Sequence, residues 1–88
     1  MSQKITKYES TPNPNAVKCW LDPGFDGAIR SFRKADDAAS DPVAATLFSV
    51  PGVNNLLISG SWMTVGKEEG AGWPSVKAEV ERVLAELP

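Results

Sequence analysis

Apolar and polar residues alternate along several short stretches of the chain, which is the pattern of half-buried β-strands. The clearest stretch, 16–21, places Val17, Cys19 and Leu21 on one face and Lys18 and Trp20 on the other. Similar stretches rich in β-branched and aromatic residues occur elsewhere. The sequence therefore predicts strands at 4–10, 16–21, 28–34, 53–59 and 62–67.

Turn-forming residues separate these strands. The stretch 22–27 reads Asp-Pro-Gly-Phe-Asp-Gly, which predicts a hairpin between the second and third strands. Gly60 lies between 53–59 and 62–67 and predicts a tight hairpin there. Residues 35–40 are expected to form a short polar connection, and 11–15, with two prolines, a stiff loop.

Two further stretches repeat their apolar residues at helical spacing. The first helix is predicted to begin at Asp41-Pro42, because Asp caps free backbone N–H groups and Pro suits the first helical position. It ends at Pro51-Gly52. The second is predicted to begin near Trp73 and to run to Leu87, with Trp73 itself filling the core.

The expected order is therefore β-β-β-α-β-β-α. Hairpins dominate this order, and only the helical crossover after the third strand could join parallel neighbours. We expect an α+β fold in which two helices pack on one face of an open, mostly antiparallel sheet. The 88 residues have no internal repeat or long linker, so 1–88 is predicted to be a single domain.

The composition removes several classes of function. The chain has no histidine and one cysteine, Cys19, so it lacks the clusters that hold zinc or an iron–sulfur cluster. Its serines have no histidine to activate them, and its acidic residues form no convincing catalytic pair, so we expect no enzyme. A net charge of −2 with scattered Lys and Arg argues against nucleic acid.

No apolar run approaches the roughly 20 residues of a membrane span. The N-terminal residues have no apolar signal core, and one cysteine allows no internal disulfide. These features together predict a cytoplasmic location without membrane association.

Four blocks of the sequence resemble one known family. The stretch 11–18, Thr-Pro-Asn-Pro-Asn-Ala-Val-Lys, is similar to the opening signature of the N-terminal domain of the Nfu/NifU-like iron–sulfur scaffold proteins. The stretch 41–53 resembles the helix of that domain and its exit, 61–67 its fifth strand, and the residues from Trp73 its final helix. The blocks occur in the same order and cover nearly the whole chain.

This resemblance implies a role in iron–sulfur cluster assembly or delivery. In the full-length family members the cluster is held by a Cys-x-x-Cys motif in a second domain, which this sequence does not contain. The resemblance thus implies an accessory module. The chain differs from the family pattern at Ser61-Trp62, where an acidic–Phe pair is usual, and at Cys19-Trp20, where an apolar site is usual.

Two groups of residues are candidates for contact with a partner. Lys18, Trp20, Trp62 and Thr64 are predicted to share the sheet face away from the helices, where an aromatic pair beside a lysine suits protein docking. Alternatively, the two tryptophans only cover each other across the strands. Thr11, Asn13 and Asn15 could present polar groups to a partner, or could only satisfy the local backbone.

The leading hypothesis is a non-enzymatic interaction domain, monomeric or weakly dimeric, that binds Fe–S assembly or recipient proteins. It would hold no cofactor by itself, and Cys19 would be a small core residue in phase with Val17 and Leu21. One alternative is a homo-oligomer that binds iron or an iron–sulfur cluster through Cys19. Another is a general peptide-docking domain.

Overall fold

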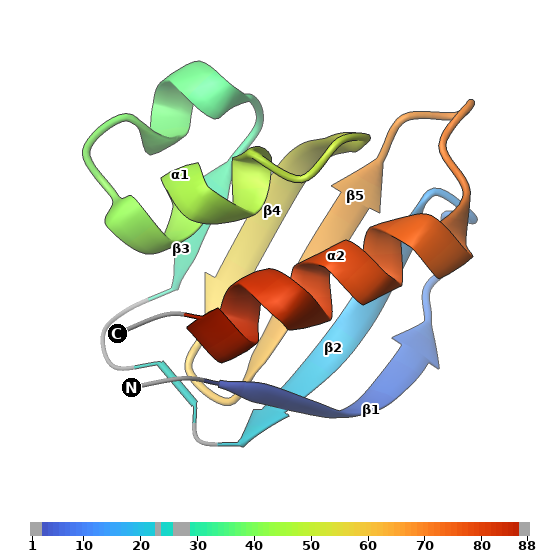
Figure 1. Ribbon diagram of the computed structural model, residues 1–88, viewed down its shortest axis with the longest axis horizontal. Helices are drawn as coiled ribbons and strands as arrows, with labels where there is room; N and C mark the ends of the chain where they lie inside the picture. The colour runs from blue at the N-terminus through green and yellow to red at the C-terminus, as the bar shows by residue number, and fades with distance from the viewer. Residues whose placement is uncertain (1–2, 23, 26–28, 87–88) are drawn as a thin grey trace.

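The computed structural model describes residues 3–22, 24–25 and 29–86, and the order of its elements confirms the predicted α+β fold (Figure 1). The strands are β1 (Lys4–Ser10), β2 (Ala16–Asp22), β3 (Arg30–Phe32), β4 (Val53–Ser59) and β5 (Trp62–Lys67). The α-helices are α1 (Pro42–Phe48) and α2 (Trp73–Glu86). A short 3-10 helix, η1 (Ala35–Ala38), occupies part of the predicted polar connection. Leu87, the predicted end of the last helix, lies outside the described residues.

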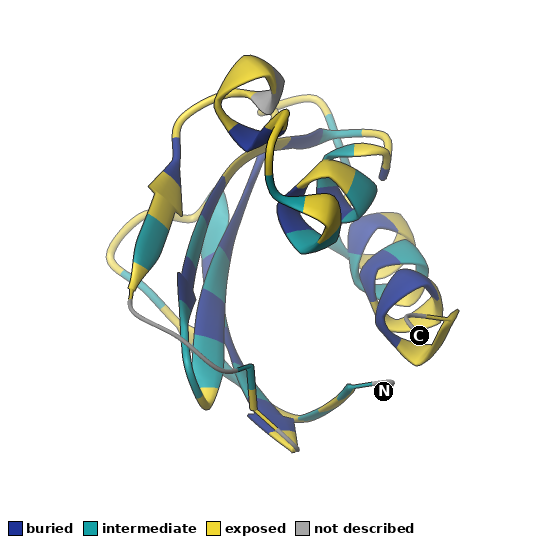
Figure 2. Ribbon diagram, turned by 90° about the vertical axis from the view of Figure 1, so that its left-hand side faces the viewer, coloured by how far each residue is buried: buried dark blue, intermediate teal, exposed yellow. Residues whose placement is uncertain are grey.

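The five strands form one antiparallel sheet in the order β1-β2-β5-β4-β3. Both α-helices lie on one side of this sheet, as Figure 2 shows, and its other face carries no helix among the described residues. The core fills the space between the sheet and the helices. It contains Val17, Cys19, Leu21, Phe32, Leu56, Ile58, Met63 and Val65 from the strands and Ala44, Leu47, Val76, Val80, Val83 and Leu84 from the helices.

The register of the central strands sorts their side chains between the two faces. Cys19 is opposite Met63, and both are buried beneath the helices. The next pair along, Trp20 and Trp62, is therefore directed to the helix-free face, because successive side chains of a strand alternate. The alternation predicted for 16–21 is thus confirmed.

The predicted hairpin between the second and third strands is wrong. β2 has β1 and β5 as neighbours, so both of its edges are occupied, and β3 pairs with β4 at the far side of the sheet. The chain instead passes the β4–β5 turn, where the Phe25 N–H donates to the Gly60 carbonyl at 2.8 Å. A Cβ at Gly24 would lie 2.7 Å from that oxygen, so the close approach requires glycine. Residues 23 and 26–28 of this predicted turn lie outside the described residues.

The helical crossover after the third strand joins antiparallel neighbours, β3 and β4. A parallel connection would have to travel the length of the sheet before β4 begins. Here η1 and α1 together lead out from the end of β3 and back, so that Phe32 pairs with Leu56 soon after β4 starts. The crossover therefore does not join parallel strands, although the sequence allowed this arrangement.

The helix starts follow the expected chemistry. Asp41 caps α1, where its side chain accepts hydrogen bonds from the N–H groups of Val43 and Ala44, both at 3.1 Å. It also forms an ion pair with Arg30 of β3, which ties the helix to the edge of the sheet. The predicted start of this helix is confirmed.

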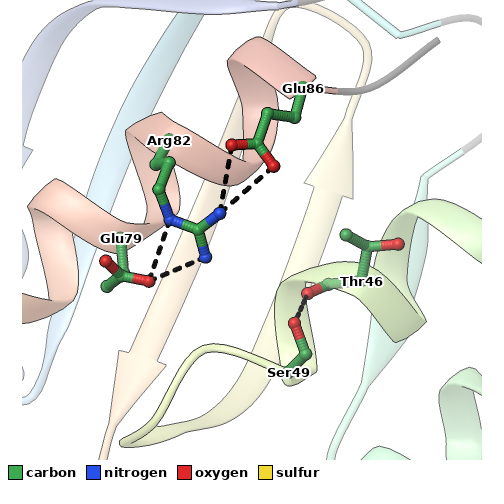
Figure 3. A network of polar contacts seen from close by, with 5 residues as sticks. All are labelled: Thr46, Ser49, Glu79, Arg82 and Glu86. Carbon is green, nitrogen blue, oxygen red and sulfur yellow. Dashed lines mark hydrogen bonds and ion pairs between the residues drawn. The ribbon is translucent and has the colours of Figure 1, made fainter.

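The outer face of α2 carries an exposed charge network. Figure 3 shows Arg82 between Glu79 and Glu86, and it is paired with them at 2.8 and 3.1 Å. In the same view, Ser49 donates from its hydroxyl to the Thr46 carbonyl at the end of α1. Exposed ion pairs such as those of Arg82 stabilise a helix by only about 0.3–0.5 kcal/mol each. The helix is held mainly by its buried apolar stripe.

Both outer strands of the sheet are irregular or short. β1 carries a bulge between Ile5 and Lys7, and two of its exposed residues are lysines, Lys4 and Lys7. β3 has only three residues. The inner strands are β2, β5 and β4, of which β4 has a register shift between Val53 and Asn55.

Gly52, between α1 and β4, provides a test of this fold. Its φ is +94°, and a Cβ there would lie 2.7 Å from the Cβ of Ala71. We expect Gly52→Ala to lower the free energy of unfolding by about 1–3 kcal/mol, measured by urea denaturation. Gly70→Ala is the control, because nothing lies within 4 Å of its Cβ position, and its effect should stay below about 1 kcal/mol. Equal effects would contradict the turn geometry.

Candidate functional site

The helix-free face carries a cluster of two tryptophans and a lysine from the central strands. Trp20 of β2 lies directly opposite Trp62 of β5, and Lys18 lies opposite Thr64. All four side chains are half-buried, although no helix in the described part of the chain covers them. The predicted common face of these residues is therefore confirmed, whereas their role as contact residues stays a prediction. We call Lys18, Trp20 and Trp62 the indole patch.

The Lys18 ammonium binds the two tryptophans of the indole patch. Its Nζ atom lies 4.4 Å from the ring centroid of Trp20 and 4.5 Å from that of Trp62. A cation at this distance is attracted by the negative ring face, which contributes about 0.5–1 kcal/mol at an exposed site. The lysine therefore stabilises the arrangement in which both rings lie beside it.

Glu9 of β1 fixes the edge of the Trp20 ring. The indole N–H donates to a Glu9 carboxylate oxygen at 2.7 Å, and Lys7 is paired with the same oxygen at 3.6 Å. The hydrogen bond from Trp20 lowers the pKa of Glu9 below its usual value, with smaller contributions from Lys7 and Lys18. The carboxylate thus stays ionised near neutral pH, and the polar atom of Trp20 is occupied.

The loop of residues 11–15 uses its polar groups locally. The Thr11 hydroxyl is within 2.8 Å of the Asn13 carbonyl and 3.0 Å of the Ala16 carbonyl. The Asn13 side-chain oxygen accepts from the Asn15 N–H at 2.9 Å. These bonds agree with the simpler prediction, that Thr11, Asn13 and Asn15 satisfy the backbone of a stiff loop.

Lys67, at the end of β5, holds the loop in place, and sequence reasoning missed it. Only 8% of this residue is exposed. Its Nζ donates to the Asn15 side-chain oxygen at 3.0 Å and to the Glu68 carbonyl at 3.3 Å. The Trp73 indole N–H donates to the Pro14 carbonyl at 3.0 Å from the other side. Trp73 is half-buried and packs against the core without being one of its buried residues, so it fills the core less completely than predicted.

A shallow hollow of about 370 Å³ lies between this loop and α2. Pro12, Pro14, Trp73 and Lys77 are among its lining residues. The Lys77 ammonium lies 4.5 Å from the ring centroid of Tyr8, whose hydroxyl donates to Glu81. Burial and the hydrogen bond to Glu81 raise the pKa of Tyr8, so its hydroxyl stays protonated.

Cys19 is a core residue with 1% of its surface exposed. It lies beneath α2 among apolar side chains, including Val17, Val65 and Val80. Burial raises the pKa of its thiol to about 12, because the apolar surroundings disfavour the thiolate. Metal binding requires the thiolate, so this environment suits a structural residue. The expectation that Cys19 is buried in phase with Val17 and Leu21 is confirmed.

Other metal ligands are also scarce. Within residues 3–22, 24–25 and 29–86, no three His, Cys, Asp or Glu side chains gather at one point. In the same part of the chain, no helix is long and apolar enough to cross a membrane.

Known proteins are similar to this chain in sequence and in fold. Residues 5–87 match the family described as scaffold protein Nfu/NifU N terminal. The chain belongs to this family. The resemblance inferred from the four sequence blocks is thus confirmed, and it extends over both helices and all five strands.

Relatives within the Nfu/NifU family are longer proteins. The chain is 35% identical over 83 residues to the NFU1 iron-sulfur cluster scaffold homolog, mitochondrial, of Drosophila erecta. That match covers 90% of this chain and 29% of the relative. A NifU-like protein of Schizosaccharomyces pombe is 33% identical over 86 residues, which cover 91% of this chain and 32% of that protein. The chain therefore spans less than a third of the length of these relatives.

Solved structures of similar chains have the same fold. The crystal structure of protein SAV1430 from Staphylococcus aureus has a TM-score of 0.74 and 30% identity, covering 91% of this chain and 96% of that chain. The solution structure of a NifU-like protein from Saccharomyces cerevisiae has a TM-score of 0.75 and 25% identity, covering 94% of this chain and 77% of that chain. In the Staphylococcus protein this Nfu-type fold makes up nearly the whole chain.

The environment of Cys19 predicts slow thiol chemistry. We expect iodoacetamide at pH 8 to modify Cys19 in the folded protein at least about 100-fold more slowly than in denaturant, because both burial and the raised pKa suppress the reactive thiolate. Mass spectrometry over time measures both rates on the same chain. Similar rates would show that the thiol is accessible, and would favour the alternative in which Cys19 binds iron.

The same raised pKa predicts a loss of stability in alkali. The unfolded chain releases the Cys19 proton near its ordinary pKa of 9.0, whereas the folded chain retains it to about pH 12. The unfolded state therefore gains stability as the pH rises through this window. We expect the urea midpoint to fall more between pH 9 and pH 11 in the wild type than in Cys19→Ala, which lacks the ionisable thiol. Parallel curves would contradict the assigned environment.

Proposed function

We propose that this protein is a non-enzymatic accessory domain in iron–sulfur cluster assembly or delivery, which binds another protein through the helix-free face of its sheet. The observation that carries the proposal is the indole patch, where Lys18 lies against the rings of Trp20 and Trp62 on the sheet face that no helix of the described residues covers. Tryptophan is enriched among the residues that dominate binding energy at protein interfaces. Family membership and the names of the relatives supply the connection to iron–sulfur clusters.

The cluster itself would be held elsewhere. A cluster normally requires four protein ligands, which are usually cysteine thiolates, and this chain has one cysteine. That cysteine lies in the core with a raised pKa, so even a dimer would not present two reactive thiolates without unfolding locally. These observations argue against the alternative of an iron-binding homo-oligomer. They favour a partner, or a further domain, as the source of the ligands.

The cellular compartment in which this domain acts would be the compartment of the protein that it binds. The Drosophila relatives carry the word mitochondrial in their names, and they extend well beyond the region that matches this chain. A cytoplasmic location therefore stays a prediction. Identification of the bound protein would define both the compartment and the step of cluster assembly in which this domain takes part.

Reconstitution tests the absence of cluster binding. Purified protein incubated anaerobically with ferrous iron, sulfide and a thiol reductant, then desalted, should show no visible cluster absorption and less than about 0.1 iron per chain, because it lacks a set of thiolates. Cys19→Ala is the matched control and should give the same result. A stoichiometric brown species that disappears in Cys19→Ala would contradict the proposal.

Trp62→Ala tests the docking face. The affinity-tagged protein should capture iron–sulfur assembly or recipient proteins from the lysate of its own cells, and Trp62→Ala should capture at least about fivefold less, because a central aromatic contact is removed. Quantitative mass spectrometry measures the captured proteins. Val43→Ala is the control, since it truncates a half-buried side chain on the helical side of the molecule.

The stability of each variant separates docking from packing. Trp62→Ala should unfold cooperatively, as should Val43→Ala, in a thermal melt. Equal capture by the wild type and Trp62→Ala would show that the two tryptophans only stabilise the sheet. Capture of proteins unrelated to iron–sulfur clusters would favour the general docking domain instead.

A further inference from the structure

The Lys18 ammonium has three N–H groups and no oxygen partner among residues 3–22, 24–25 and 29–86. Its contacts in this part of the chain are the ring faces of Trp20 and Trp62. Glu9 lies opposite Lys18 in the register, but its carboxylate binds the Trp20 indole N–H and Lys7. An ammonium donates up to three hydrogen bonds, so Lys18 retains donors for an incoming acceptor.

The charge of this region is opposite to that of the whole chain. The neighbouring residues Lys7, Lys18 and Glu9 sum to one positive charge, whereas the full chain has a net charge of −2. The positive charge would repel a basic ligand, and a neutral ligand would leave the one excess positive charge of these three residues unpaired. The complementary group is therefore an anion, and at the indole patch it meets a positive charge that lies between two aromatic rings.

The surroundings of Lys18 are apolar on both sides. Trp20 and Trp62 flank it on β2 and β5, and Leu57 of β4 is paired with Thr64 on the same face and is half-buried. A hydrated inorganic anion would gain nothing from these side chains. A carboxylate carried by a polypeptide, with aromatic or aliphatic residues beside it, would use both the cation and the apolar walls.

We propose that the indole patch binds a protein segment that presents one Asp or Glu carboxylate between apolar side chains, with the carboxylate accepting a hydrogen bond from Lys18 and the apolar side chains packing on Trp20 and Trp62. This inference rests on the proposed function and adds the chemistry of the partner. Single-stranded nucleic acid also stacks on aromatic side chains, but it needs several phosphate contacts, and here only one positive charge is in excess.

Selection from a random peptide library displayed on phage tests the proposal without knowledge of the natural partner. The immobilised wild-type protein should enrich peptides with Asp or Glu next to Trp, Phe, Leu or Ile. A synthetic copy of the most enriched peptide, and the same peptide with its acidic residue changed to the corresponding amide, should differ about tenfold in Kd by fluorescence anisotropy. The binding should also weaken as salt is raised.

Variants of the protein assign the contact to Lys18. Lys18→Gln should weaken the acidic peptide about tenfold. It should weaken the amide peptide by a much smaller factor, since that peptide feels only the lost contacts between the ammonium and the two rings. Lys18→Arg should retain binding within about threefold, because a guanidinium also stacks on indole rings and donates to carboxylates. Lys34→Gln is the control, as it removes one positive charge at an exposed residue outside the patch. Thermal melts verify that each variant is folded.

Each contrary outcome has a distinct meaning. Equal binding of the acidic and amide peptides, or loss with Trp62→Ala but not with Lys18→Gln, would overturn the carboxylate assignment and leave the docking face in place. Enrichment of neutral or basic peptides, or of none, would overturn it as well, as would tighter binding of a thymidine oligonucleotide. A concentration-dependent dimer that is lost in Trp62→Ala would show that a second copy of the chain covers the patch. The lysate capture with Trp62→Ala tests the proposed function separately.

Discussion

The pairing of β2 with β5 inside the sheet determines which face carries the cysteine and which face carries the indole patch. In the observed register Cys19 meets Met63 on the side of the helices, and Trp20 meets Trp62 on the other side. Side chains alternate along a strand, so a slip of one residue would exchange the two faces. The thiol would then meet solvent and the indoles would enter the core. The observed register buries Val17, Cys19, Met63 and Val65 beneath the two helices. The same register keeps the thiol away from solvent and the two indole rings on the opposite face.

Much of this arrangement could be predicted because it depends on local patterns. The alternation around Cys19 identified the two faces of β2, and the Asp41-Pro42 pair marked the start of α1. The hairpin expected after β2 was wrong for a reason that no local pattern contains. Turn residues show that the chain changes direction, but the next strand depends on which edges of the sheet are still open, and those of β2 are taken by β1 and β5.

The sequence predicted which residues of the candidate site share a face, but it did not predict the contacts between their side chains. Spacing placed Lys18 and Trp20 on one face, but spacing alone does not show that a lysine lies between two rings from different strands. The burial of Lys67 was harder to predict, since a lysine at a strand end is normally solvated. Its burial follows from an amide oxygen of Asn15, 52 residues away in sequence, which accepts one of its hydrogen bonds. Contacts between such distant residues have no sequence signature without related sequences to compare.

The edges of the sheet have their own consequence for how the protein meets other chains. An open strand edge is a template for another strand, and proteins guard such edges with bulges, charged side chains or short strands. Here β1 combines a bulge with two lysines, and β3 offers an outer edge of only three residues. These devices disfavour recruitment by strand addition and protect the isolated chain from growing into fibrils. Sheet edges of this kind leave side chains, and not backbone groups, as the means by which another chain could be recognised selectively.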